Sequence, residues 1–562
     1  MLLSNLNLLA TAPGGVARLR ELILTLAVQG KLVPQDTADE PASVLLQKIR
    51  AEKDRLIAEG KIKKDKPLAA IAEEEKPFEL PVGWEWVQLA VLAEQITKGT
   101  TPTTFGHGYT QEGVNFVKIE NLDRGRLNLA QMTDFISPET HEIMSRSQLS
   151  AGDVLFSIAG TIGKTAVVLD ADLPANTNQA LAIIKGAAKH VNQRFLLLAL
   201  DSFVSNKVKE KARGGAMNNI SLGDLSELLM TIPPLAEQSR IVARVEELMR
   251  LCDALQAKGQ LEATQHAQLL STLLGTLTAS ATPEELADNW QRVAQHFDLL
   301  LDRPQAIDAL EQTLLQLAVR GLLVPQDPTD EPASVLLQKI RAEKDRLIAE
   351  GQIKRDKPLP PITDEEKPFE LPLGWEWVRV GSVGITQTGG TPASSKPEHF
   401  NGDFPFIGPG QITPTGEILQ PEKFISELGC LESAVAVPGD ILMVCIGGSI
   451  GKSARVQFAT AFNQQINAIQ PLWACSEFVL IAMKAADFVS AVISTATGSA
   501  TPIISKGKWD LLLLPLPPLA EQSRIVTRVT QLRRLCADLR QRLAEREAVQ
   551  ARLAEALVQQ VA

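Results

Sequence analysis

Residues Asp39 to Gly60 read DEPASVLLQKIRAEKDRLIAEG, and the same 22 residues return without a change from Asp330 to Gly351. The copy extends beyond both ends of this stretch at a constant offset of 291 residues. A second block, PPLAEQSRIV, begins at Pro233 and again at Pro517. Between these blocks the two halves differ greatly. The chain is therefore a tandem duplication in which a near-identical frame carries two unlike inserts, an arrangement that presents two different binding surfaces in matching poses.

Helical periodicity marks the frame. Apolar residues recur at three-to-four spacing from residue 13 to residue 29 and again along the repeated stretch, so each copy is expected to begin with two helices. Pro41 lies in the first turn of the second helix and Gly60 at its C-terminal cap. The basic run Lys61–Lys66 that follows is read as a solvated linker in preference to a nucleic-acid patch.

The inserts have a different pattern, with short apolar runs separated by turn residues. Asp153–Ile158 and Leu181–Ile184 are typical strands, and a helical pattern returns only around Arg194–Ala212. Each insert is therefore predicted to be a mixed α/β (α+β) domain. The predicted domains are a helical segment (1–80), a first insert (81–232), a central helical region (233–371), a second insert (372–516) and a C-terminal helix (517–562).

A long helix is predicted after each insert. Ile241, Val245, Leu248, Cys252 and Leu255 alternate by four and three, which is a heptad seam. The second copy repeats this seam after Pro517. A seam needs a partner, and the economical choice is the other copy, in an antiparallel coiled coil with intramolecular pseudo-two-fold symmetry. The alternative is that each helix packs separately on its own domain.

Composition limits the class of protein. The five cysteines form no CxxC pair, which fits a reduced cytosol and not a structural zinc site. Met1–Val33 aligns with Arg292–Val324, so the N-terminus is read as the first copy of an internal segment and not as a signal peptide. No window of about 18 uninterrupted apolar residues occurs, and a soluble cytoplasmic protein without membrane contact is expected. The formal charge of −10 leaves two options: the chain does not bind DNA, or partner subunits supply most of the phosphate contacts.

Two motifs resemble phosphate-binding loops. Gly160-Thr-Ile-Gly-Lys-Thr165 and Gly448-Ser-Ile-Gly-Lys-Ser453 lack the first glycine of a Walker A motif, and an apolar strand, not a helix, follows the first of them. A hairpin turn is the better interpretation, with Lys164 and Lys452 at its tip facing either a DNA phosphate or solvent.

Other polar loop residues are candidates for DNA contacts. The side chains of Asn178-Gln179 and Asn463-Gln464-Gln465 have two alternative interpretations. Asparagine and glutamine can read adenine bidentately, and they can equally cap or bridge buried strands; we favour the structural role. Threonine, serine and lysine in long loops suit contacts to the DNA grooves, although ordinary loops look similar. The candidate DNA-binding residues are Lys98, Thr100, Thr101, Lys118, Asn121, Lys164, Asn178, Gln179, Arg213, Asn218, Asn219, Thr391, Ser394, Ser395, Lys396, Gln411, Lys452, Asn463, Gln464, Thr501 and Lys506.

Catalytic patterns are missing from the sequence. The six histidines have no metal-ligand spacing, and no nuclease, amino-methyltransferase or nucleophile-elbow motif occurs. We therefore expect no catalytic residues, no bound metal and no cofactor.

Three duplicated motifs give a resemblance to a known family: LAVQGKLVPQ from Leu26, LPVGWEW from Leu80 and PPLAEQSRIV from Pro233. Together they resemble the DNA-specificity (S) subunits of type I restriction–modification systems, over essentially the whole chain. The resemblance implies two target recognition domains, each reading one half of a bipartite, asymmetric sequence in double-stranded DNA. It also implies a helical frame that binds two methyltransferase (M) subunits and, through them, the restriction (R) subunits. Catalysis and S-adenosylmethionine binding would then belong to the partners.

A competing hypothesis is a non-catalytic protein–protein scaffold, in which the duplicated coiled-coil frame displays two domains that bind protein or glycan ligands. A neighbouring methyltransferase gene would favour the DNA-specificity hypothesis.

Overall fold

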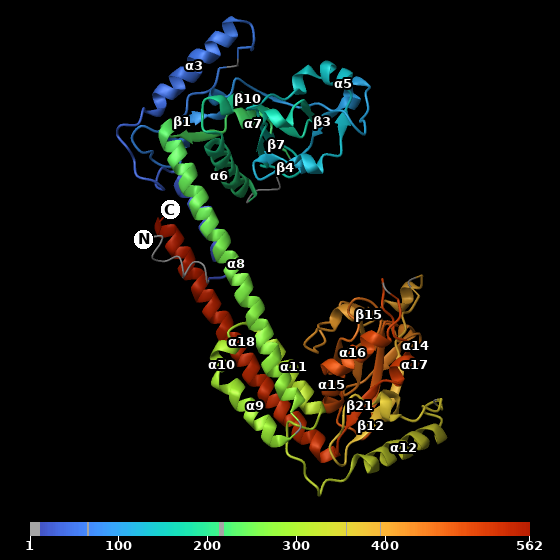
Figure 1. Cartoon of the computed structure of the whole chain (residues 1–562). Coiled ribbons are helices and arrows are strands. Elements are labelled where there is room, and N and C mark those ends of the chain that lie inside the picture. The colour runs from blue at the N-terminus through green and yellow to red at the C-terminus, as the bar shows by residue number, and fades with distance from the viewer. Residues whose placement is uncertain are drawn as a thin grey trace. The chain divides into compact units, whose positions relative to one another are not determined.

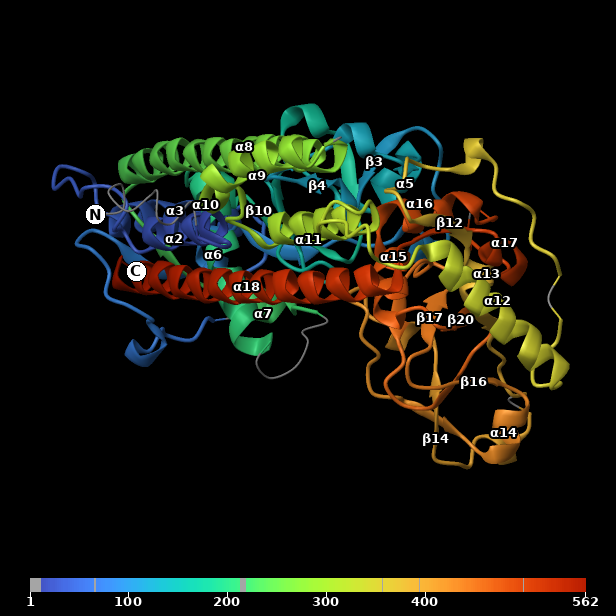
Figure 2. The same ribbon diagram turned by 90° about the horizontal axis from the view of Figure 1, so that it is seen from below.

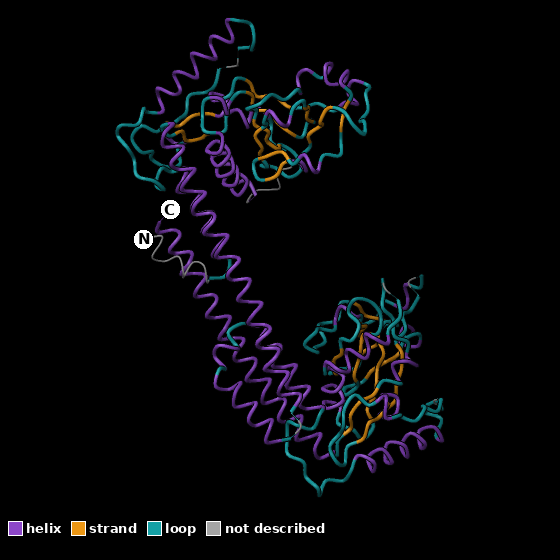
Figure 3. The backbone as a smooth tube through the Cα atoms, in the orientation of Figure 1, coloured by secondary structure: helices purple, strands orange, loops and turns teal. Residues whose placement is uncertain are grey.

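The computed structural model describes residues 12–64, 67–212, 219–280, 282–355, 357–393, 395–498 and 500–561. The chain divides into two compact units. The first comprises residues 1–260 and 547–562, and the second residues 261–546. In each unit, helices lie beside a domain that holds the strands (Figures 1 and 3).

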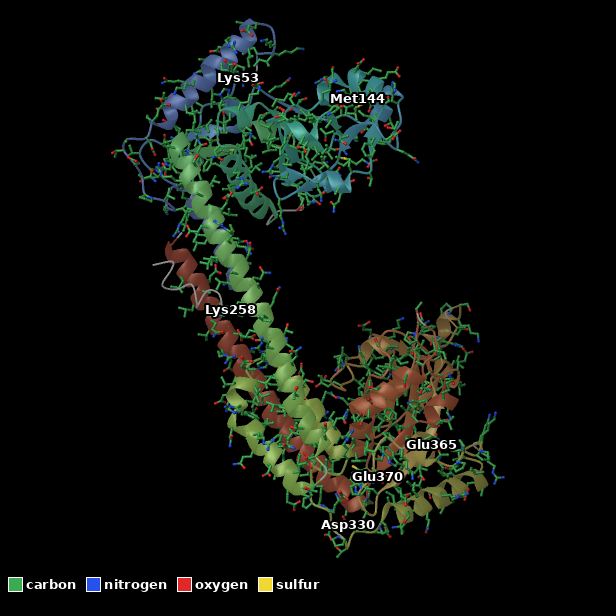
Figure 4. The ribbon with its side chains drawn as sticks, viewed as in Figure 1. Lys53, Met144, Lys258, Asp330, Glu365 and Glu370 are labelled. Carbon is green, nitrogen blue, oxygen red and sulfur yellow. The ribbon has the colours of Figure 1, made fainter. Side chains whose placement is uncertain are left out.

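The repeated stretch forms the same helix twice, as predicted. α3 (Ala42–Ala58) and α12 (Ala333–Ala349) have equivalent bounds, and each follows a proline in extended conformation. In α3 the apolar face buries Leu45 and Ile49. Lys53 follows Ile49 on the same face of α3, and its Nζ donates to the carbonyl oxygens of Ala90, at 3.0 Å, and Ala93, at 2.9 Å. Figure 4 labels this residue on the helix. The neighbouring frame helices are α2 (Gly15–Val28) in the first unit and α9 (Pro283–Gln295), α10 (Phe297–Leu300) and α11 (Pro304–Val319) in the second.

The insert of the first unit contains two main sheets. A four-stranded sheet has the order β2-β10-β7-β8, and a three-stranded sheet has the order β6-β3-β9. The first and last strands of the insert, β1 and β11, pair with each other and close the domain. Its elements are β1 (Glu85–Gln88), α4 (Leu89–Leu92), β2 (Gln95–Lys98), β3 (Val114–Val117), β4 (Leu122–Asp123), β5 (Arg126–Leu127), β6 (Phe135–Ile136), α5 (Pro138–Ile143), β7 (Val154–Ser157), β8 (Thr165–Val167), β9 (Ala175–Thr177), β10 (Leu181–Lys185), α6 (Gln193–Ala212), α7 (Leu222–Ser226) and β11 (Leu229–Ile232).

The second insert has the same plan, although its sequence differs. Its central sheet has the order β13-β20-β17-β18, and β15-β14-β19-β16 forms the distal sheet, which lies beyond β17 and β20 in Figure 2. The mixed α/β prediction is confirmed for both inserts. The elements are β12 (Glu376–Arg379), α13 (Val380–Val383), β13 (Gly384–Thr388), β14 (Phe404–Ile407), β15 (Lys423–Ile425), α14 (Glu427–Leu431), β16 (Ala434–Ala436), β17 (Ile441–Val444), β18 (Ser453–Arg455), β19 (Thr460–Phe462), β20 (Ile466–Pro471), α15 (Ser476–Lys484), α16 (Ala486–Thr495), α17 (Lys506–Asp510) and β21 (Leu513–Leu516).

The two predicted long helices are present as α8 (Leu235–Ala279) and α18 (Leu519–Val561). Within the second unit they run in opposite directions (Figure 1). Apolar residues of both helices are buried there, including Leu274 on α8 and Cys536 on α18. The seam residues predicted for α8, among them Ile241, Val245 and Cys252, are buried in the core of the first unit. The predicted antiparallel pairing of the two long helices is confirmed, and helix α11 joins the same core through Ile307 and Leu310. A helix of three or more turns with its own apolar stripe competes for the same buried space.

Among the described residues, no single helix is long and apolar enough to cross a membrane; the bent pair α15 and α16 meets the length and composition criteria only when taken together.

Candidate nucleic-acid interface

Strand register brings the predicted loops of the first insert to one edge of its central sheet. At the end of β2, Lys98 is opposite Ala182 of β10. Ser157, the last residue of β7, is opposite Leu181, the first residue of β10. The loop after β2, the β7–β8 turn and the β9–β10 turn therefore leave the sheet together. We call this region, with the segment from Asn219, the polar edge.

Close backbone contacts hold the loop after β2 against the β9–β10 turn. The Gly99 amide donates to the Leu181 carbonyl at 3.1 Å, and the Thr100 amide donates to the Thr177 carbonyl at 3.0 Å. A Cβ atom on Gly99 would lie 2.1 Å from the Thr177 oxygen, so only glycine fits there. The Thr101 hydroxyl donates to Oε1 of Gln179, which orients that exposed amide.

The Gly160–Lys164 segment is a turn between two antiparallel strands, as predicted, and not a phosphate-binding loop. Strands β7 and β8 pair on either side of it. The Ser157 amide donates to the Lys164 carbonyl at 2.9 Å, and Gly160 and Gly163 have φ angles of 67° and 92°. Lys164 is exposed at this turn. Its backbone is fixed and its ammonium group is free to meet solvent or an anion.

A fourth segment completes the polar edge. Asn219 forms an isolated bridge with Ala159, and the Ile220 amide donates to the Ile158 carbonyl at 2.8 Å. The exposed side chain of Asn219 therefore lies beside the β7–β8 turn. Arg213 and Asn218 lie outside the described residues.

The second insert repeats this arrangement with other residues. The Gly389 amide donates to the Ile466 carbonyl at 3.0 Å, and the Thr391 hydroxyl donates to Oε1 of Gln464. A Cβ atom on Gly389 would lie 2.1 Å from the Asn463 oxygen.

The remaining loops also meet in the second insert. The Val444 amide donates to the Lys452 carbonyl at 2.8 Å across the β17–β18 turn, and the Gly447 amide donates to the Pro502 carbonyl at 2.9 Å. The latter contact brings the segment that contains Thr501 to the same edge. Ser394 lies outside the described residues.

The asparagines of the Asn-Gln segments have the structural role that the sequence analysis favours, and the base-reading role of the glutamines stays a prediction. The carboxamide oxygen of Asn178 accepts from the Ala180 amide at 3.1 Å, and that of Asn463 accepts from the Gln465 amide at 3.0 Å. The two asparagines therefore shape their turns. Gln179 and Gln464 are exposed beyond them, and each accepts a hydrogen bond from a threonine hydroxyl.

Asn121 is a correction to the predicted set. It is 3% exposed, its oxygen accepts from the Lys118 amide at 2.8 Å, and its amide group donates to the Gln131 carbonyl at 3.0 Å. The side chain shapes its own turn, so we remove it from the DNA-contacting candidates. Gln411 has the corresponding role, since its oxygen accepts from the Gly408 amide at 3.0 Å, although this side chain is partly exposed.

Ion pairs separate the candidate lysines into two groups. Lys118 pairs with Asp134, Lys396 with Glu432 and Lys506 with Asp510, each at 2.7 Å. The hydrogen bond from Lys396 lowers the pKa of the Glu432 carboxyl and keeps it charged. Lys98, Lys164 and Lys452 have no ion-pair partner among the described residues, so the ammonium groups of these three candidates are free to meet an anion.

Two turn residues were missed by the sequence reasoning. Thr161 lies exposed between the glycines of the β7–β8 turn, and Ser449 lies partly exposed in the β17–β18 turn. Their position between two glycines of a predicted hairpin was the signal that could have identified them. Ser395 is exposed in the loop after β13 and Thr501 in the segment before α17, both without a specific contact that would fix its role.

Comparisons with known proteins add independent information. The family model for the type I restriction modification DNA specificity domain matches residues 81–265 and 372–546. The EcoAI specificity subunit of a type I restriction enzyme from Escherichia coli is 36% identical over 97% of this chain and 93% of its own length. The EcoEI specificity subunit from the same species is 33% identical over the same shares. The crystal structure of the HsdS subunit from Thermoanaerobacter tengcongensis aligns with a TM-score of 0.39 and 21% identity, over 87% of this chain and 98% of that one.

Proposed function

The chain belongs to the type I restriction–modification DNA-specificity family, and from this membership we propose that its two polar edges read the two halves of one bipartite, asymmetric DNA sequence. The observation that carries the proposal is the assembly of the same four loops at one edge of each insert, with different side chains in the two copies. The shared backbone gives the two polar edges the same geometry, and their different side chains would recognise different DNA half-sites.

The side chains of the first polar edge divide by chemistry. Lys98 and Lys164 supply charge to phosphates and set the position of the domain on the duplex. Gln179 is suited to base contacts, since its Oε1 is oriented by Thr101 while its Nε2 group stays free to donate in the major groove. Asn219 adds a second carboxamide beside the turn.

The second polar edge has less free charge. Lys452 is its unpaired lysine, while Lys396 and Lys506 are paired with acids. Its exposed polar side chains include Gln464 and Thr501. We therefore expect the second half-site to be bound with fewer phosphate contacts from this chain than the first.

With a formal charge of −10, a chain that reads DNA is expected to depend on partners for most of the phosphate contacts. We propose two methyltransferase subunits bound to the helical frame, with restriction subunits attached through them. The chain is the non-catalytic specificity subunit in this assembly, and methylation and cleavage are reactions of the partners.

The test is a methylome. The chain is expressed with its methyltransferase in a host that lacks modification, and N6-methyladenine is mapped across the genome. A new bipartite motif that disappears without this chain is the expected result. Replacing residues 81–232 with another recognition domain should change one half of the motif only. The absence of any motif, despite an active methyltransferase, would refute the proposed function.

Helix length supplies a second test. The two inserts are joined through α8 and α18, so the lengths of these helices should set the number of unread base pairs between the half-sites. Lengthening α8 by one turn should change the spacer and keep both half-sites. An unaltered spacer would contradict this role of the helix.

A further inference from the structure

The frame exposes one apolar side chain at the same place in each unit. Val82 and Leu373, related by the offset of 291 residues, are both 98% exposed. Each precedes a glycine with positive φ, 89° at Gly83 and 86° at Gly374. The two loops therefore have the same backbone geometry and present the apolar residue to solvent.

The loop is fixed between the starts of two frame helices. The Gly83 carbonyl accepts from the Ala42 amide of α3 at 2.8 Å, and a Cβ atom on Gly83 would lie 3.7 Å from Cγ of Pro234, just before α8. The next residue, Leu235, is 48% exposed. We call Val82 and Leu235 the junction patch of the first unit.

The second unit repeats these contacts. The Gly374 carbonyl accepts from the Ala333 amide at 2.9 Å, and the Cβ position of Gly374 is 3.8 Å from Cγ of Pro518. Leu519 is 41% exposed. Leu373 and Leu519 form the junction patch of the second unit.

Unpaired acids flank both patches. Glu79 and Glu85 lie three residues on either side of Val82, and both are exposed without an ion-pair partner among the described residues. Glu370 and Glu376 have the same positions around Leu373, and Glu370 is labelled at the end of the second unit where α12 begins (Figure 4). An apolar projection flanked by acids is unsuited to DNA, because the carboxylates repel phosphates.

Isolated exposed apolar residues are common on protein surfaces and carry no function alone. Val82 and Leu373 differ from such isolated residues in one respect. The residue at this position is valine in one copy and leucine in the other, so it is apolar in both, and a glycine follows it in both. A surface present once in each half suits a partner that is present twice. In the proposed function the methyltransferase subunit has that stoichiometry.

We propose that each junction patch docks one methyltransferase subunit, which covers Val82 or Leu373 with an apolar pocket bordered by lysine and arginine. This assignment rests on the proposed function. It adds a specific contact point in each unit, and it makes the two docking events separable.

The experiment uses the full chain, coexpressed with its methyltransferase, and counts subunits by native mass spectrometry. The wild-type chain should bind two methyltransferase subunits. Val82→Asp and Leu373→Asp should each leave one, and the double variant none. The dissociation constant of the altered site should rise about 30-fold or more, the scale of a central interface contact. Leu431→Asp is the matched control, since Leu431 is 83% exposed outside the patches and should keep two subunits.

A second measurement does not depend on the folding of the aspartate variants. A photo-crosslinking amino acid at position 82 or 373 should crosslink the methyltransferase and not a second copy of this chain. Two bound subunits in the double variant, or crosslinks only between copies of this chain, would overturn the docking assignment. A wild-type chain that binds no methyltransferase would refute the proposed function as well.

Discussion

The contacts that hold each recognition domain on its helices recur in the two units, whereas the side chains of the polar edges do not. The Trp84 indole donates to the Glu237 carboxylate at 3.0 Å, and the Trp375 indole donates to Glu521 at 2.9 Å. The next glutamine, Gln238, accepts from a backbone amide of the insert in the first unit. These groups come from the sequence blocks that the duplication left almost unchanged.

An ion pair completes the frame contacts in both units. Arg240 pairs with Asp39 and Arg524 with Asp330, each at 2.5 Å. At the polar edges the outcome differs, because Asn219 of the first unit occupies the place of Ile503 in the second. The difference teaches that the frame contacts define a fixed pose, while the exposed positions within that pose are free to change with the target.

The largest expected effect comes from breaking the frame in one unit. Trp375 is 6% exposed, and Trp375→Ala removes its packing and leaves the buried Glu521 carboxylate without its indole donor. The second unit should lose about 3–5 kcal/mol of stability. Hydrogen–deuterium exchange should then accelerate in β21 and the first half of α18, with the first unit unchanged.

Trp473→Ala is the control for this experiment, since Trp473 is 59% exposed and should change exchange little. Trp84→Ala should produce the mirror result, with faster exchange in the first unit only. Equal acceleration in both units after either tryptophan replacement would show that the two frames are not independent.

The next effect concerns the polar edge. Gly99→Ala places a Cβ atom against the Thr177 carbonyl and so displaces the loop that carries Thr100 and Thr101. Binding to DNA with the intact first half-site should weaken by about 10- to 100-fold, the cost of one mismatched base pair or more. The affinity is measured by fluorescence anisotropy on the complex with the methyltransferase.

Gly108→Ala is the matched control in the same loop, because a Cβ atom there meets no atom within 4 Å. It should bind DNA like the wild type. Gly389→Ala should weaken recognition of the second half-site instead. If Gly99→Ala and Gly108→Ala behaved alike, the close contact would have no part in recognition.

Much of the fold was predictable from the sequence because the duplication separates the frame from the inserts. The β7–β8 turn was predictable as well, since the strand pattern after Lys164 excluded the helix that a phosphate loop requires. The clustering of Lys98 with Gln179 depends on strand order, which short apolar runs do not specify. The role of Asn121 depends on hydrogen bonds to Lys118 and Gln131, and neither its residue type nor its loop position reveals them.

A smaller effect should follow from removing one phosphate contact. Lys164 is exposed and unpaired, and Lys164→Ala should lower the slope of the logarithm of affinity against the logarithm of salt concentration by about 0.9. Both specific and non-specific DNA should show the change. Lys396→Ala is the control, because Lys396 already pairs with Glu432 at 2.7 Å, and its slope should change less. A larger change in the Lys396 variant would reverse the assignment of free and paired lysines.

The smallest expected effect tests the buried acid that the two frames share. Glu237 is 1% exposed, and burial raises the pKa of its carboxyl, opposed by the hydrogen bond from Trp84. A carboxyl whose folded pKa lies above its unfolded value stabilises the fold fully below the unfolded pKa, and that contribution is lost as pH rises through the folded pKa.

Glu237→Gln removes the charge and keeps an oxygen that accepts from the indole. The difference in Tm between this variant and the wild type should therefore be more favourable to the variant at pH 7 than at pH 5. Glu521→Gln should behave in the same way, because burial also raises the pKa of Glu521. Glu120→Gln, at an exposed position, serves as the control with no change in relative Tm. A Glu237→Gln variant that melts below the wild type by the same margin at both pH values would mean that the frame needs the charged carboxylate, whose charge attracts Arg240, as that of Glu521 attracts Arg524.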